Sequence, residues 1–386
     1  MVLPLCALPA KEAEAIEVRI AFIRAPRAAE SLSILETPAA DDGIAGARLA
    51  IEDNNTTGRF LGQSFTIEDA VLEPGGGLAA VFDDFVRRGI YFIAADLPPP
   101  LLLALSDAAR DKGILIFNTA AAEDSLREEN CRTNVFHIAP SHSMLADGLA
   151  QYLVWKQWKR WLLMKGSHPE DELFADAMRR AAKKFGAKIA EERTYEDTGG
   201  GRRSDSGSVQ TQRLIPAATQ NAPPYDVLVA ADESEVFAGY LPYRTWDPRP
   251  VAGSAGLKPV SWDGSHEQWG AIQLQNRFMK LASRRMNARD NNAYVAVRMI
   301  GEAAARTGSS DPQIIRRYLT GPDFAIAAFK GQRQTLRPWN QQLRQPILLG
   351  DGRTIVSVSP QEGFLHQTSQ LDTLGFDEPE TKCKLQ

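Results

Sequence analysis

An alternation of strand-like and helix-like sequence over residues 18–70 restricts this chain to a small set of folds. The mostly apolar run at residues 18–23 is typical of a strand that is covered on both faces. Apolar residues then recur at helical spacing over residues 44–51, and the asparagines and glycine within 54–58 are expected to end that helix. A second strand is expected over residues 64–70. The segment therefore predicts a β-α-β unit.

The same alternation continues to residue 117 and restarts after residue 139. Strands that alternate with helices of this length form parallel sheets with right-handed crossovers, so an α/β protein with two sheet-containing lobes is predicted. Ligands of such sheets bind beyond the carboxyl ends of the strands. Candidate site residues at these strand ends are Arg24, Asp96, Asn118 and Thr119 in the first lobe and Lys165 and Asp232 in the second.

Length and charge limit the classes of protein that this chain can represent. A chain of 386 residues exceeds what one hydrophobic core usually supports, so two domains are expected. The formal net charge of −4 argues against a nucleic acid as the main partner, because phosphate binding needs a positive surface. The sequence has no run of about 18 apolar residues, so no membrane-embedded segment is expected.

Residues 1–15 resemble the remainder of a signal peptide. Residues 2–10 are apolar and uncharged, and small residues at positions 13 and 15 offer a cleavage site after Ala15. A basic leading segment is missing, and the alternative is the frayed N-terminus of a cytosolic protein. Export would place the protein in the periplasm of a Gram-negative bacterium.

The cysteines allow two arrangements. Cys6 would leave with the signal peptide, so that Cys131 and Cys383 would remain. In an oxidising periplasm a lone pair of cysteines often forms a disulfide, which would pin the C-terminal tail to the first lobe. Two free thiols are the alternative.

The sequence contains no recognisable catalytic constellation. It lacks a phosphate-binding GxxxxGK[ST] loop, a GxSxG nucleophile elbow, an HExxH motif and a CxxC pair. His137 and His142 are the only closely spaced histidines, and their separation of five argues against shared metal ligation. The chain is therefore expected to be no enzyme and to hold neither a metal nor a catalytic cofactor.

The C-terminal half is rich in basic residues. Between Arg277 and Arg353 there are 14 basic and five acidic residues, an excess of +9 in a chain that is negative overall. Twelve of the 14 are arginines, which suit planar carboxylates, and several tryptophans lie in or beside the same half. The pattern, and the run Arg337-Pro338-Trp339-Asn340 in particular, is typical of a site for a flat anionic ligand. The alternative is that the arginines coat solvated helices and the tryptophans are core residues.

Several segments resemble the type I periplasmic substrate-binding proteins of ABC importers, in the branched-chain amino acid receptor group. These segments include GARLAIEDNNTTGRFLGQSFTI at residues 46–67 and VFHIAPSHSMLADGLAQYL at residues 135–153, and the resemblance covers residues 16–301. The resemblance implies two Rossmann-like lobes, joined by a three-segment hinge, that close on a ligand. The implied divisions are a signal-peptide remnant (1–15), lobe 1 (16–138), lobe 2 (139–264), helices returning to lobe 1 and crossing the hinge (265–335), and a C-terminal hairpin and tail (336–386).

Two C-terminal segments resemble a subgroup associated with pyrroloquinoline-quinone-dependent alcohol dehydrogenase systems. They are LRPWNQQLRQPILL at residues 336–349 and EGFLHQTSQLDTLGFDEPE at residues 362–380. The resemblance implies pyrroloquinoline quinone (PQQ), a planar tricarboxylate, as the ligand, and ABC transporter membrane subunits or the dehydrogenase system as partners. The alternatives are a receptor for branched-chain amino acids or other small molecules and a sensor module on the same fold. The candidate ligand contacts are Arg24, Arg337 and Arg344 for the carboxylates, Trp262 and Trp339 for stacking, Asn118, Thr119 and Asn340 for the ring edges, and Lys165 and Asp232 at the cleft rim.

Asp96 stands where amino-acid receptors of the group hold the ligand carboxylate. Here it brings a negative charge, and Pro98, Pro99 and Pro100 remove three backbone donors. The loop therefore disfavours an amino-acid zwitterion.

Overall fold

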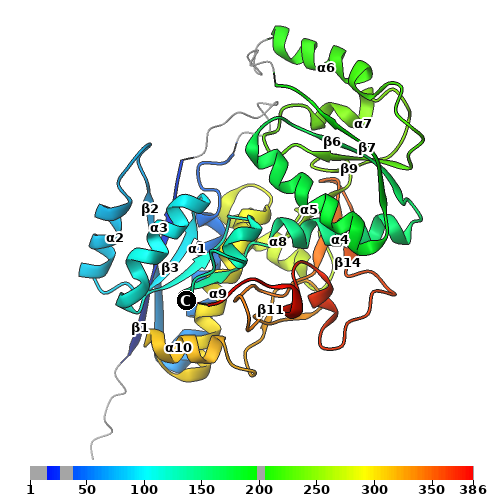
Figure 1. Ribbon diagram of the computed structural model, residues 1–386. Coiled ribbons are helices and arrows are strands. Elements are labelled where there is room, and N and C mark those ends of the chain that lie inside the picture. Colours follow the sequence, from blue (N-terminus) through cyan, green and yellow to red (C-terminus); the bar gives the residue numbers. More distant parts are fainter. Residues whose placement is uncertain (1–14, 27–37, 198–204, 386) are drawn as a thin grey trace, which may run out of the picture.

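The computed structural model describes residues 15–26, 38–197 and 205–385, and it consists of two lobes that each contain a parallel sheet (Figure 1). The predicted signal peptide falls almost entirely on residues 1–14, which lie outside the described residues. The predicted α/β class with two parallel-sheet lobes is confirmed.

Lobe 1 is built on a five-stranded sheet in which every neighbouring pair of strands is parallel. The strands in spatial order are β2 (Gln63–Val71), β1 (Ile16–Arg24), β3 (Phe92–Asp96), β4 (Leu115–Asn118) and β5 (Val135–His137). The helices between them are α1 (Ile44–Leu61), α2 (Leu78–Arg87) and α3 (Pro99–Ala109), with 3-10 turns η2 (Arg110–Lys112) and η3 (Asp124–Arg127). Both faces of the sheet are covered, which explains why β1 and β3 are apolar on both sides.

Lobe 2 repeats the plan with a four-stranded parallel sheet. Its strands in spatial order are β7 (Lys188–Thr194), β6 (Arg160–Lys165), β8 (Val227–Ala231) and β9 (Val251–Gly253). Its helices are α4 (His142–Trp155), α5 (Pro169–Phe185), α6 (Asp205–Thr219) and α7 (Leu241–Arg244), with a 3-10 turn η4 (Ala238–Tyr240). One core of this lobe lies between the sheet and helices α4 and α5, and a second lies on the other face of the sheet, against α6 and α7.

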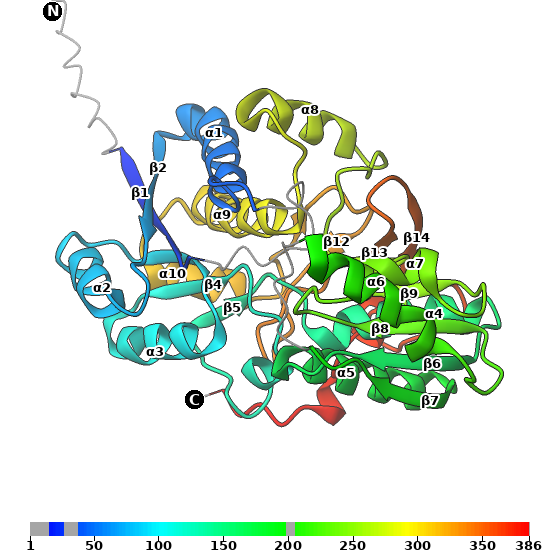
Figure 2. The same ribbon diagram turned by 90° about the horizontal axis from the view of Figure 1, so that it is seen from above.

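The rest of the chain completes both lobes. The elements that follow are β10 (Lys258–Val260), α8 (Ala271–Ala282), α9 (Ala288–Thr307), α10 (Pro312–Leu319), β11 (Ile326–Ala327), β12 (Arg333–Gln334), β13 (Ile347–Gly350), β14 (Ile355–Ser359), η5 (Gln370–Thr373) and η6 (Glu378–Glu380). Helices α1 and α9 cover one face of the lobe 1 sheet, and α2 and α3 cover the other (Figure 2). Strand β13 pairs in antiparallel fashion with β10 and β14 beside α4.

The chain passes between the two cores three times. The first passage leads from Ile138 in the lobe 1 core to α4 in the lobe 2 core. The second leads from β9 to Trp262, which is buried in lobe 1, and the third from Leu343 in lobe 1 to Ile347 in lobe 2. These passages form the three-segment hinge.

Helices α1 and α9 approach so closely that only glycine fits at two positions. A Cβ atom on Gly46 would lie 1.9 Å from the carbonyl oxygen of Asp290, and one on Gly301 would lie 2.2 Å from the side chain of Asn54. The expected end of α1 at residues 54–58 is wrong, because the helix continues to Leu61. Asn54 is buried in this contact and donates to the carbonyl of Val297 at 3.0 Å, so tertiary packing outweighs its low helix propensity.

Replacing Gly46 with alanine is expected to destabilise the fold by about 1–3 kcal/mol, because the backbone of α9 must move away. Urea unfolding of the variant measures this loss. The matched control is Gly76→Ala, since a Cβ atom there meets nothing within 4 Å. A loss no larger than that of the control would contradict the close approach.

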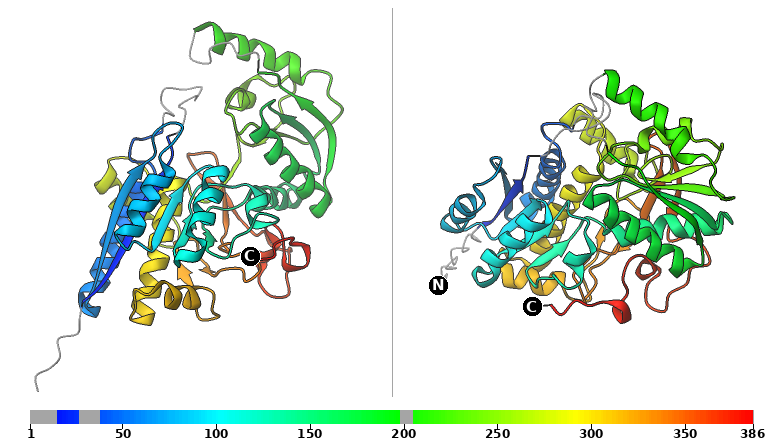
Figure 3. Two further views of the ribbon diagram at one scale, coloured as in Figure 1. Left: turned by 60° about the vertical axis from the view of Figure 1, so that its left-hand side comes forward. Right: turned by 45° about the horizontal axis from the view of Figure 1, so that its top comes forward.

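The C-terminal strap, residues 366–383, binds to both lobes (Figure 3). On lobe 2, Asp147 accepts a hydrogen bond from the Gly375 amide at 2.8 Å, and Lys184 donates to the Gly375 carbonyl at 2.9 Å. On lobe 1, Cys383 is disulfide-bonded to Cys131, with an S–S distance of 2.05 Å. Of the two cysteine arrangements that the sequence allowed, the structure has the bridge.

Candidate functional site

A cavity of about 330 Å³ lies between the lobes, at the carboxyl ends of the strands of both sheets. Strands β1, β3 and β4 run in the same direction, so their carboxyl ends meet at one edge of the lobe 1 sheet. Lobe 2 contributes the first turns of α4 and α5 and the turn after β8. The lining residues are Ala25, Pro26, Asp96, Leu97, Pro98, Pro99, Ala120, Ala121, Ala122, Glu123 and Arg289 from lobe 1 and His142, Glu170 and Glu233 from lobe 2.

The loop after β4 is fixed from behind by two buried polar side chains. The side-chain oxygen Oδ1 of Asn118 accepts from the backbone amide of Ala121 at 2.9 Å, and its side-chain nitrogen Nδ2 donates to the backbone carbonyl of Ala121 at 2.8 Å. Arg127 donates to the carbonyls of Ala121 and Glu123 and to the side chain of Gln342, directly before the third hinge passage. Burial lowers the pKa of Arg127 to about 10, which leaves it charged at neutral pH. The loop therefore has a defined shape that is tied to the hinge.

On lobe 2, carboxylates organise the turn that follows β8. Asp232 is buried and accepts from the amides of Val236, Phe237 and Ala238. Ser234 donates to Asp171, at the start of α5, with an O···O distance of 2.9 Å. Burial raises the pKa of Asp232, and these backbone donors oppose that shift. The turn is thereby fixed with its Glu233 side chain exposed at the cavity.

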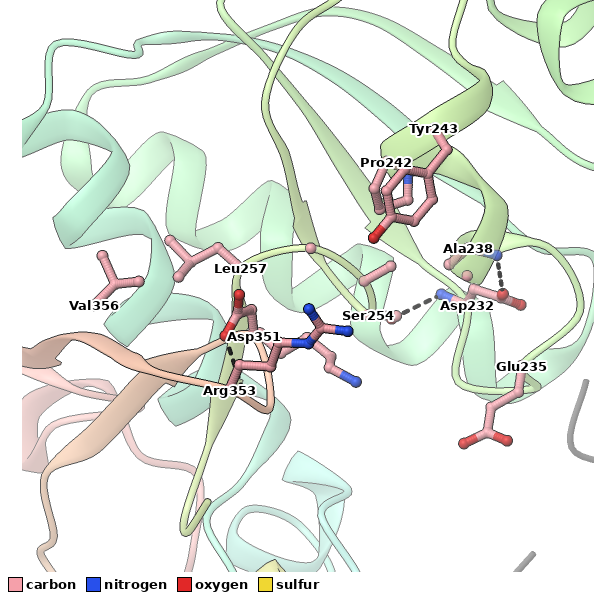
Figure 4. A pocket seen from close by; sticks show the side chains of 14 residues that line it. Asp232, Glu235, Ala238, Pro242, Tyr243, Ser254, Leu257, Asp351, Arg353 and Val356 are labelled. Carbon is pink, nitrogen blue, oxygen red and sulfur yellow. Dashed lines mark hydrogen bonds between the residues drawn. The ribbon is translucent and has the colours of Figure 1, made fainter. Parts of the chain in front are cut away.

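A second cavity, of about 620 Å³, lies on the other side of this turn, within lobe 2 (Figure 4). It is shared by the segment after β8, the turn after β9 and the β13–β14 hairpin. Ser254 separates the two cavities, because its hydroxyl accepts from the Asp232 amide and donates to Glu233. Lys258 and Arg353 line the second cavity together with the ring of Tyr243.

The predicted strand-end residues are only partly brought together. Asp96 lines the inter-lobe cavity, and Asn118 and Thr119 lie directly behind its Ala120–Ala122 wall. Asp232 lines the second cavity. Arg24 instead pairs with Asp69 at 2.8 Å, and Lys165 pairs with Glu172 and Glu192 on lobe 2.

The structure does not bring the predicted C-terminal arginines and tryptophans to the inter-lobe cavity. Arg337, which is 1% exposed, donates to Asp372 at 2.9 Å, and Arg344 donates to the same carboxylate at 2.8 Å. Trp339 lies against both guanidinium groups: the centroid of its ring is 5.6 Å from Cζ of Arg337 and 5.2 Å from Cζ of Arg344.

The remaining two members of the predicted ligand set also make contacts within the protein. Trp262 is a core residue of lobe 1, and Asn340 accepts from the Gln342 amide. The role of these side chains as ligand contacts therefore stays a prediction without support from the geometry. The physical reason is that the C-terminal strap supplies Asp372 as an internal partner for the arginines.

The site residues that sequence reasoning missed are Glu123, Arg127, His142, Glu170, Glu233 and Arg289. Four of them, Glu123, His142, Glu170 and Glu233, lie two to five residues beyond the end of a strand, which is the signal that could have found them. Arg127 lies at the end of η3, outside that range. Arg289 comes from α9, far along the chain, and nothing local marks it.

A lysine is buried where the three hinge passages meet. Lys330 donates to Gln345 at 2.6 Å, and Gln345 in turn donates to the carbonyl of Ile138 at 2.6 Å. Burial lowers the pKa of Lys330 to about 7. The same burial, together with the charge of Lys330, lowers the pKa of His266 beside it.

The buried amine predicts a pH dependence of stability. Unfolding restores the ordinary pKa of Lys330, near 10.4, so between about pH 7 and pH 10 the unfolded chain binds a proton that the folded chain lacks. The stability that Lys330 contributes is therefore expected to rise with pH across this window, by at most about 1.4 kcal/mol per unit. The measurement is the difference in unfolding free energy between the wild type and Lys330→Met at pH 6, 7, 8 and 9. A difference that is independent of pH would contradict the prediction.

The described residues contain no group of three or more His, Cys, Asp or Glu side chains that could hold a metal ion. No helix within the described ranges is long and apolar enough to cross a lipid bilayer.

Comparisons with known proteins relate the chain to periplasmic binding proteins. A family model described as periplasmic binding protein matches residues 35–209, just under half of the chain. A search of curated proteins by sequence gives no match.

Solved structures cover nearly the whole chain at low identity. An amino acid ABC transporter substrate-binding protein from Pseudomonas fluorescens Pf-5 has a TM-score of 0.69 at 14% identity, covering 97% of this chain and 100% of its own. The leucine-, isoleucine-, valine-, threonine- and alanine-binding protein from Brucella ovis, in its closed conformation, has a TM-score of 0.68 at 14% identity, covering 87% and 89%. An ABC transporter solute-binding protein from R. palustris, in complex with benzoate, has a TM-score of 0.65 at 10% identity, covering 96% and 100%. The chain therefore has the fold of the type I periplasmic binding proteins.

Proposed function

We propose that this protein is a periplasmic solute-binding protein of an ABC-type importer, which captures a small molecule between its lobes and carries it to the membrane subunits. The observation that carries the proposal is the cavity lined from both lobes at the carboxyl ends of both sheets. A ligand that touches both lobes stabilises their closed arrangement, so binding and closure are coupled.

Capture without chemistry fits the residues that line this cavity. Among the described residues, they include no serine, threonine, cysteine or lysine that could act as a nucleophile. The well-ordered carboxylates nearby, Asp171 and Asp232, are held by backbone and hydroxyl donors and serve to shape the loops. The arrangement therefore favours a receptor over an enzyme.

The C-terminal resemblance predicts PQQ as the specific ligand. The described residues of the inter-lobe cavity offer few basic partners for its carboxylates. Arg289 is the single arginine among the lining residues, and it is paired with Asp96 at 2.5 Å. The second cavity carries the cations Lys258 and Arg353 beside the acids Asp232, Glu235 and Asp351, so PQQ carboxylates would find two basic partners there among three acidic neighbours. Binding of PQQ through such basic partners would thus involve the second cavity.

Calorimetric titration tests the ligand, and X-ray scattering of the same samples tests closure. PQQ, leucine and the metabolite pool extracted from expressing cells are added in turn, and a decrease in the radius of gyration marks closure. We expect at least one solute to bind with heat and to close the lobes. Turnover of a bound solute, or binding that leaves the scattering unchanged, would contradict the proposal.

A sensor module on the same fold is the alternative to a transport receptor. Deletion of the gene separates the two, because loss of a transport receptor lowers uptake of the ligand. A sensor would instead change gene expression while uptake stayed normal.

A further inference from the structure

The inter-lobe cavity carries an excess of negative charge. Its lining residues include four carboxylates and one guanidinium group. Since Arg289 is paired with Asp96, the side chains that remain are Glu123, Glu170 and Glu233, together with His142. Three carboxylates around a cavity of about 330 Å³ attract a cation and repel an anion.

The helix N-termini at the cavity are not available to an anion. Helix N-termini are the usual anion holders of α/β folds, because their first amides are free and the helix dipole is positive there. Helix α3 begins with Pro99 and Pro100, which have no amide hydrogen. Helix α5 begins with Pro169 and carries Glu170, Asp171 and Glu172 in its first turn.

The first turn of α4 is also satisfied within the protein. The Met144 amide donates to Ser141, and the Ser143 amide donates to Asp124. All three helix starts therefore present proline, carboxylate or an occupied amide. This arrangement is independent of the glutamates that line the cavity. It disfavours an anion because no free backbone amide at these helix starts is left to bind one.

One of the glutamates has a carboxylate oxygen without a partner. The Oε2 atom of Glu123 is buried and has no hydrogen-bond partner, although its loop is rigidly held by Arg127. Glu233 accepts from Ser254 and is crowded by protein; this desolvation raises its pKa, while the nearby His142 and the Ser254 hydrogen bond act in the opposite direction. A buried carboxylate oxygen without a donor is costly, and a ligand N–H would satisfy it.

We propose that the inter-lobe cavity binds a small organic ammonium ion, held by Glu123 on lobe 1 and by Glu170 and Glu233 on lobe 2. This inference rests on the proposed function, because it names the ligand class of that same cavity. Carboxylates from both lobes meet one cation only when the lobes approach each other. Neutralisation of their mutual repulsion is then what couples binding to closure.

The ammonium group is expected to be primary, with N–H donors. Quaternary ammonium ligands are recognised by aromatic cages. The lining residues of this cavity include no phenylalanine, tyrosine or tryptophan, and its apolar part consists of alanines, prolines and Leu97. Such a wall accommodates a short aliphatic body, and the carboxylates bind the N–H groups.

Calorimetry on the full chain tests whether the ligand is a primary ammonium ion, with four probes of similar size: 1,4-diaminobutane, n-butylamine, choline and butyrate. We expect the diamine to bind most tightly, the monoamine more weakly, and choline and butyrate to give no heat. Glu123→Gln is expected to weaken binding of the diamine by about 10- to 100-fold, because it removes a charge-assisted hydrogen bond. The control is Glu73→Gln, an exposed glutamate outside the cavity, which should leave the affinity unchanged.

The outcomes separate this inference from the proposed function. Binding of butyrate or PQQ with lobe closure, and no heat with either amine, would overturn the ammonium class and leave the receptor function intact. Amine binding that Glu123→Gln and Glu233→Gln both leave unchanged would also overturn it. If neither the amines nor the cell-derived solutes change the scattering, the receptor function fails as well.

Discussion

Replacing Asp372 with asparagine is expected to lower the free energy of unfolding by about 3–5 kcal/mol, the range for breaking a buried ion pair. Asp372 is 1% exposed and accepts from both Arg337 and Arg344. Asparagine keeps the size of the side chain but removes its charge. Two buried guanidinium groups would then face each other without a counter-ion, beside the ring of Trp339.

The measurement is urea unfolding followed by tryptophan fluorescence, because Trp339 reports on this network directly. The two lobes can unfold separately, so each transition is fitted by itself. Asp323→Asn is the matched control, since Asp323 is exposed. Should Asp372→Asn cost no more than this control, the network would not stabilise the C-terminal strap.

Removal of the Cys131–Cys383 disulfide is the change with the second large expected effect. The bridge joins residues that are 252 positions apart in the sequence. Without it the unfolded chain gains conformational freedom, which typically lowers the free energy of unfolding by about 2–5 kcal/mol. The expected result for Cys131→Ser with Cys383→Ser is a loss in this range. The Glu128 carboxylate, which accepts from the Lys382 amide, would remain to hold the end of the strap on lobe 1.

Hydrogen exchange of residues 381–385 complements the unfolding measurement, because these amides should exchange faster without the bridge. The double serine variant and the wild type in a thiol reductant should agree. Equal stability of the double variant and the wild type would contradict the prediction.

The fold could be predicted from the sequence because its signal is local and repeated. The apolar strands β1, β3 and β8 are buried on both faces, so each one shows as a short continuous run. The end of α1 could not be predicted in this way. Asn54 and Gly58 read as stop signals in isolation, and only their burial in tertiary contacts explains why the helix continues.

The candidate site could be predicted only where it depends on topology. Asp96 lines the inter-lobe cavity because the carboxyl end of β3 lies at that edge of the sheet. The role of Arg337 and Arg344 as ligand contacts stays a prediction, since a count of charge along the sequence does not reveal partners that are distant in the chain. Arg284 pairs with Asp41, Arg289 with Asp96 and Arg337 with Asp372, so part of the apparent basic region is neutralised within the folded protein.

The C-terminal strap has a consequence for how the lobes can move. Three peptide segments cross the hinge, and the strap adds a fourth link. It is covalent at Cys131 on lobe 1, and on lobe 2 it consists of the hydrogen bonds of Gly375 with Asp147 and Lys184 and the Arg180–Glu380 ion pair. Two bodies held at four points are expected to lose much of their freedom to twist or slide past each other. If the lobes open and close as proposed, we expect the strap to restrict that movement, so that each approach repeats a similar relative orientation.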